Sequence, residues 1–135
     1  MRITKFLVVA IIAGLFSISV SAQTDHLAIA NQAFEGQEYY KAITLLKKAY
    51  SKEKDKANKA EIIFKTAECY RFVNDSKQSE TWYRKALKIK YPENKVQLYY
   101  ADALKANGKF EDAIVEYEKY GELAPDDPRG KNGAE

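Results

Sequence analysis

The segment of residues 95–125 constrains the fold most, because two apolar patterns of helical period meet within it and a proline closes it. The two patterns meet at Asn107-Gly108. This pair is typical of a helix end, since glycine adopts left-handed backbone angles without steric cost. Ala101 and Ala113 are small enough to let two helices approach closely. The segment therefore predicts two antiparallel helices joined by a tight turn.

A single helical pair of this kind cannot bury its apolar faces, so further copies are expected in the same chain. Ala30, Ala67 and Ala101 occupy matching positions, and the first interval is three residues longer than the second. In the first copy Gly36 lies one residue earlier than the turn glycine of the third. The predicted repeats span residues of about 23–56, 60–93 and 94–127.

This layout resembles the tetratricopeptide repeat (TPR), a helix–turn–helix unit of about 34 residues. The third copy matches the family pattern at seven positions: Ala101, Leu104, Gly108, Phe110, Ala113, Tyr117 and Pro125. Tyr120 departs from it, because the family usually has a small residue there. The resemblance implies an all-α fold, a right-handed α-solenoid of about three TPR units over residues 23–125.

Residues 1–22 have the three-part layout of a secretory signal peptide. Arg2 and Lys5 precede an apolar run, and small residues at Ser21 and Ala22 predict cleavage before Gln23. The alternative is an uncleaved membrane anchor, for which the apolar run is short. Cleavage would leave 20 basic and 19 acidic residues, a net charge of about +1. The alternating signs of these charges favour neither a nucleic-acid partner nor a one-sided basic patch.

The sequence favours binding over catalysis, because catalytic or metal-ligating residues do not cluster in it. His26 is the only histidine and is expected at the surface. Cys69 is the only cysteine, so an internal disulfide is impossible, and it is expected to be a buried, inert thiol. No cofactor, metal ion or small-molecule substrate is predicted.

Two segments of the chain lie outside the repeat pattern. The lysine-rich run of residues 51–60 predicts a solvated helix end and linker, with a partner-binding patch as the alternative. Residues 126–135 form a C-terminal tail or the start of a truncated capping helix. Asp127 and Pro128 suit an N-cap and a first helical residue, but the rest is expected to be too short for that helix. We therefore expect the chain to be a fragment of a longer protein, and the alternative is that the last repeat packs against another chain.

The resemblance to TPR proteins also implies a groove, lined by the first helix of each unit, that holds a partner segment. The implied groove residues are Asn31, Phe34, Phe64, Glu68, Arg71, Phe72, Leu98, Asp102 and Lys105. The alternative is that the aromatic residues among them only pack between helices. The family mode that clamps a C-terminal carboxylate is disfavoured, because Leu27 stands where that mode needs a lysine.

Four phrases resemble the N-terminal repeat region of large OmpA-family envelope proteins, some of which serve type IX secretion and gliding. They are AEIIFKTAECYR, TWYRKALK, YADALKANGKFEDAI and YGELAPDDPRG. This resemblance implies a periplasmic interaction scaffold that is associated with the outer membrane only indirectly and binds a protein or peptide of the envelope. The alternatives are a structural spacer within a larger OmpA-like protein and, more remotely, an outer-membrane protein assembly factor.

Overall fold

The computed structural model describes residues 25–135, which form seven α-helices and contain no β-strand. The predicted signal peptide and its cleavage site lie outside the described residues. The helices are α1 (His26–Glu35), α2 (Tyr39–Lys52), α3 (Lys56–Phe72), α4 (Ser76–Lys88), α5 (Lys95–Ala106), α6 (Phe110–Leu123) and α7 (Pro128–Ala134). The predicted all-α class is confirmed for this part of the chain.

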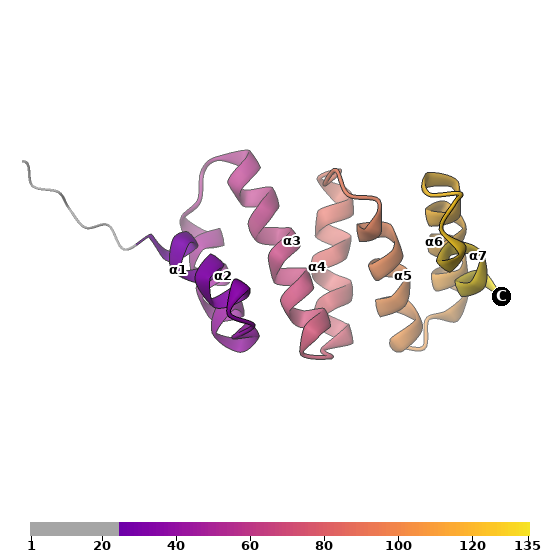
Figure 1. The fold of residues 1–135 in the computed structure, drawn as a ribbon, viewed down its shortest axis with the longest axis horizontal. Coiled ribbons are helices and arrows are strands. Elements are labelled where there is room, and N and C mark those ends of the chain that lie inside the picture. Colours follow the sequence, from indigo (N-terminus) through magenta and orange to yellow (C-terminus); the bar gives the residue numbers. More distant parts are fainter. Residues whose placement is uncertain (1–24) are drawn as a thin grey trace, which may run out of the picture.

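Each helix packs against the next one along the chain, and α1 also contacts α3. The helices therefore follow one another in a row, with alternating directions, from α1 to α6 and α7 (Figure 1). Aspartate side chains cap the start of four helices by accepting backbone hydrogen bonds, as N-caps do. These caps are Asp25, Asp55, Asp75 and Asp127.

The turns inside the three successive helix pairs have the same geometry. Gln37, Asn74 and Gly108, which occupy matching positions, have φ angles of 59°, 58° and 76°. In each turn the next residue donates its N–H five residues back, as in Glu38 to Ala33, which is the Schellman arrangement. The sequence indicated Gly36 as the first turn glycine, but Gly36 has a φ of −76° and Gln37 adopts the left-handed conformation.

Small residues are buried at the predicted positions of each helix pair. Ala101 and Ala113 lie in one cluster of the core, together with Leu98, Leu104, Tyr117 and Tyr120. Ala30, Ala42 and Ala67 lie in the other, which extends from α1 to Val96. Ser79 takes the place of alanine on α4 and is equally buried. The core is thus continuous within each helix pair, and the boundary between the two clusters falls within α5.

The three extra residues between the first and second pairs lengthen a helix. The connection from α2 to α3 is only residues 53–55, and α3 begins at Lys56. Half of the lysine-rich run is therefore the first turn of α3. The interpretation that the insertion forms a loop between units is wrong, because Asp55 caps the helix early by accepting from the Asn58 N–H at 2.9 Å.

A short helix, α7, covers part of the last helix pair, so the expectation that too few residues remain for a helix is also wrong. Asp127 is its N-cap and Pro128 its first residue, as the sequence indicated. Gly130 lies so close to Gly121 of α6 that an added Cβ would be 2.7 Å from the Gly121 nitrogen. This backbone-to-backbone approach is possible because Gly130 carries no side chain.

Candidate functional site

The nine groove residues inferred from the family resemblance divide into two groups by exposure. Three of them are buried: Phe64, Glu68 and Leu98. The other six remain at least partly accessible: Asn31, Phe34, Arg71, Phe72, Asp102 and Lys105. Leu98 is only 2% exposed and belongs to the core, so it offers no surface to a partner. Phe64 stacks on Tyr91 at 4.6 Å between ring centroids, which corresponds to the packing alternative.

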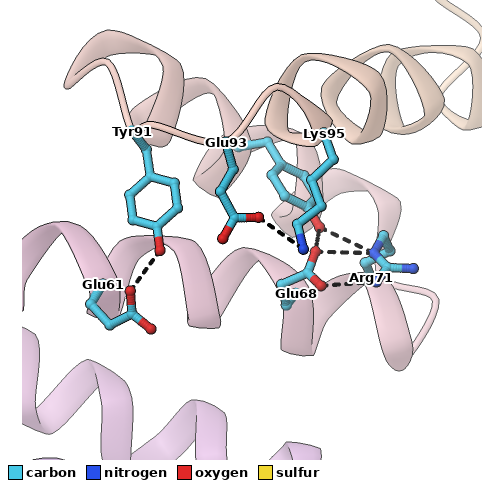
Figure 2. A network of polar contacts seen from close by, with 7 residues as sticks. Glu61, Glu68, Arg71, Tyr91, Glu93 and Lys95 are labelled. Atoms are coloured by element: carbon cyan, nitrogen blue, oxygen red, sulfur yellow. Dashed lines mark hydrogen bonds and ion pairs between the residues drawn. The ribbon is translucent and has the colours of Figure 1, made fainter. Parts of the chain in front are cut away.

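Arg71 is the residue that joins most of the other groups. Its Nε and Nη2 donate to the Glu68 carboxylate at 3.2 and 2.9 Å, and Nε also donates to the Tyr83 hydroxyl at 3.1 Å. The Tyr83 hydroxyl in turn donates to Glu68 (Figure 2). Three polar groups from α3 and α4 therefore satisfy one another at the edge of the core.

The protonation states in this cluster follow from its surroundings. Burial lowers the pKa of Arg71, but its hydrogen bonds and charge interactions with Glu68 and Tyr83 outweigh that effect and raise it overall. Burial, together with the neighbouring Glu68 carboxylate, raises the pKa of Tyr83. Arg71 is therefore a permanent cation here and Tyr83 a permanent hydrogen-bond donor at physiological pH.

The same tyrosine–carboxylate contact recurs at the matching positions of the next helix pair. The Tyr117 hydroxyl on α6 donates to Asp102 Oδ1 on α5 at 2.5 Å. Lys105, which corresponds to Arg71, lies with its Nζ 5.6 Å from the centre of the Tyr117 ring. In the first pair Asn31 occupies the position of Asp102 and accepts from Lys65 Nζ at 2.9 Å instead. Residues at these matching positions thus make polar contacts in all three helix pairs.

A row of aromatic rings continues from the guanidinium of Arg71. That group lies 4.3 Å from the Phe72 ring centre and 4.1 Å from that of Tyr99, distances typical of cation–π contacts. Phe72 stacks on Tyr39 at 4.6 Å, and Tyr39 meets Phe34 edge to face at 6.1 Å. The row connects α1, α2, α3 and α5. Within it, Phe72 stays 42% exposed.

A pocket of about 270 Å³ opens beside Arg71, between the α3–α4 turn and α5. Its lining residues are Arg71, Asn74, Ser76, Ser79, Tyr99, Asp102, Ala103 and Ala106. Arg71 and Asp102 provide opposite charges at this pocket, and the alanines provide an apolar wall. Its volume lies near the lower end of the range of about 300–1,000 Å³ for clefts that hold small molecules.

A second group of contacts lies near the α4–α5 connection (Figure 2). The Tyr91 hydroxyl donates to Glu61 Oε2 at 2.6 Å, and burial together with Glu61 raises the pKa of Tyr91. Lys95 Nζ lies 2.8 Å from Glu93 Oε2. These groups pair with one another. They therefore hold the helix pairs together more than they offer free hydrogen-bonding groups to a ligand.

Tyr99 and Lys65 are the residues of this face that the sequence reasoning missed. They occupy matching positions in successive repeats, three residues before Asp102 and Glu68. Three-residue spacing places side chains on one side of a helix, so helical periodicity could have found them. A further signal in the sequence is a basic residue that follows an acidic one by three positions and precedes a tyrosine by twelve. This signal occurs at Arg71 and Tyr83 and again at Lys105 and Tyr117.

The isolated residues with reactive side chains show no arrangement for catalysis in residues 25–135. Cys69 is fully buried, and this burial together with Glu68 raises the pKa of its thiol to about 12. His26 is half-buried, and its Nε2 lies 3.5 Å from Lys52 Nζ. No group of three or more metal-ligating side chains gathers within the described part of the chain.

No protein-family model matches this chain, and no curated protein matches its sequence. Within residues 25–135, none of the helices has the length and apolar character needed to cross a bilayer.

Proposed function

We propose that the chain is a TPR-type interaction scaffold of the cell envelope, which binds an extended segment or helix of a protein partner along the face of α1, α3 and α5. The finer fold that belongs to this proposal is a right-handed α-solenoid of three TPR units, with that face concave. The matching left-handed turn residues Gln37, Asn74 and Gly108 support a repeated unit. The predicted signal peptide supports a periplasmic address.

The observation that carries the proposal is the half-exposed guanidinium of Arg71 between two aromatic rings. Its side chain is 31% exposed although it already pairs with Glu68. Arginine and aromatic residues dominate the binding energy of protein interfaces, because they combine large contact areas with directed hydrogen bonds. Arg71 and Phe72 are held in place by Glu68, Tyr83 and Tyr39, so little conformational freedom is left to lose on binding.

The pocket beside Arg71 indicates a peptide as the ligand. At about 270 Å³ it has room for a side chain of the partner, and Arg71 and Asp102 line it with a basic and an acidic group. The implied ligand has a side chain that enters the pocket and apolar residues that cover the Phe72–Tyr39 stack. A cationic or hydroxyl-bearing side chain would complement Asp102.

Site-specific photo-crosslinking in the native cells tests this function. A photoreactive amino acid replaces Phe72 or Lys105 on the proposed binding face, or Tyr40, which is 74% exposed on α2. The proposal requires that positions 72 and 105 form adducts with the same segment of one envelope protein and that position 40 does not. Equal labelling at all three positions, or none at any, would support the structural spacer instead.

A further inference from the structure

The solvent-facing sides of α4 and α6 carry opposite charges at matching positions. On α4 the exposed side chains on the side opposite the core include Lys77, Arg84 and Lys88. The residues one repeat further along the chain, on α6, are Glu111, Glu118 and Glu122. Spacings of seven and four residues keep each set of three on a single side of its helix.

These six charges remain without partners in a single copy. Within residues 25–135, none of them takes part in an ion pair or a side-chain hydrogen bond of its charged group. Each stripe also places like charges four residues apart, at Arg84 and Lys88 and at Glu118 and Glu122, which is unfavourable on an isolated helix. A complementary surface would neutralise both stripes at once.

The helix directions make this face complementary to itself. The starts of α4 and α6, Ser76 and Phe110, are also one repeat apart, so matching residues lie equally far from the start of their helices. Because directions alternate along the chain, α4 and α6 run the same way (Figure 1). A half-turn about an axis that is parallel to both helices, in front of the face and laterally midway between α4 and α6, preserves positions along the helix axes and sets α4 of one copy opposite α6 of the other. Each basic residue of one copy then faces the matching acidic residue of the other.

We propose that this α4–α6 face docks a second copy of the chain, in a two-fold symmetric dimer held by the charge pairs Lys77–Glu111, Arg84–Glu118 and Lys88–Glu122. The symmetry repeats each pair, as isologous interfaces do. The face of α1, α3 and α5 stays free for its own partner.

Ionic strength and charge reversal test the dimer through sedimentation velocity of the purified protein. Exposed charges interact over about 30 Å in 0.01 M salt but only about 3 Å in 1 M salt. We expect a dimer at low salt that dissociates at high salt. We expect Arg84→Glu and Glu118→Arg each to weaken it on the order of tenfold, because each places like charges together twice.

Mixing the two variants provides the decisive step. A copy with Arg84→Glu and a copy with Glu118→Arg have complementary stripes again, so at low salt the mixture should dimerise about as tightly as the wild type, whereas each variant alone dimerises more weakly. The matched control is Lys47→Glu, an equally exposed charge at the corresponding position of α2, outside the pairing, and it should dimerise like the wild type. A wild type that is monomeric at low salt, or a mixture that stays monomeric, would overturn the proposal.

Discussion

Arg71 holds the carboxylate of Glu68 through two hydrogen bonds, from Nε at 3.2 Å and from Nη2 at 2.9 Å. Glu68 is buried, whereas Arg71 keeps part of its guanidinium at the surface. One residue thus serves both the core and the proposed binding face. Any charge reversal at Arg71 therefore changes folding as well as binding.

We expect Arg71→Met to lower the free energy of unfolding by about 2–4 kcal/mol, because it leaves the buried Glu68 carboxylate without its cation. Chemical denaturation monitored by circular dichroism measures this change. The double variant with Glu68→Met should recover only part of the loss, because the unpaired buried charge is gone but the buried Tyr83 hydroxyl has then lost both of its hydrogen-bond partners. A single variant as stable as the wild type would show that the pair contributes nothing.

At matching turn positions, removing a glycine and introducing one should change the stability of the protein in opposite directions. Gly108→Ala should cost about 1 kcal/mol, because its φ of 76° is unfavourable for a residue with a Cβ. Gln37→Gly should leave stability unchanged or raise it by up to about 1 kcal/mol, since it relieves that strain in the first turn. Equal destabilisation by both changes in a thermal unfolding experiment would contradict the shared turn geometry.

Glu80 makes stability depend on pH at the junction of α4 and the α5–α6 turn. It accepts from Asn107 Nδ2 and Lys109 Nζ, both at 2.7 Å. Burial raises the pKa of Glu80, but these two hydrogen bonds lower it by more, so the net shift is downward. The stabilisation is therefore present above the unfolded-state pKa of about 4.3 and is lost as the pH falls through the folded-state value.

We accordingly expect Glu80→Gln to destabilise the protein by about 1 kcal/mol at pH 7 and by less at about pH 3, where the wild-type carboxyl is becoming protonated. Urea denaturation at the two pH values measures the difference. The control is Asp126→Asn, an exposed residue between α6 and α7, which should have little effect at either pH. A Glu80→Gln effect that grows on acidification has the wrong sign for this explanation.

The contact between α6 and α7 depends on two glycines with different requirements. Gly130→Ala should destabilise the protein by about 1–3 kcal/mol and release α7, because its Cβ would lie 2.7 Å from backbone. Gly121→Ala should be neutral or stabilise by up to about 1 kcal/mol, because no heavy atom lies within 4 Å of the added Cβ. Hydrogen exchange of the α7 amides separates the two outcomes, and protection retained in Gly130→Ala would refute the close packing.

The helix pairs, their turns and their small core residues could be predicted from the sequence, because apolar periodicity and Asn107-Gly108 act over short distances. The early start of α3 could not, since it follows from the Asp55 cap within a run that composition alone marks as solvated. Gln37 was missed because Gly36, the intrinsically better left-handed residue, lies next to it.

The candidate site was predicted less completely than the fold. The groove pattern located Arg71 and Phe72 on the accessible face, but it also included Leu98, which lies in the core. Tyr39 and Tyr99 were missed because they complete the aromatic row through contacts between helices. Such contacts depend on how far each helix is rotated about its axis, which a family pattern gives only to within one residue.

A pull-down from envelope extract with three forms of the protein tests the proposed binding face most directly. The forms are the wild type, Phe72→Ala and Tyr40→Ala, each checked for folding by circular dichroism. Phe72 lies on the proposed binding face, whereas Tyr40 is an equally aromatic and more exposed residue of α2. The proposed function predicts a partner that the wild type and Tyr40→Ala retain and that Phe72→Ala loses. A partner that survives Phe72→Ala but is lost with Tyr40→Ala would place binding on the opposite face and contradict it.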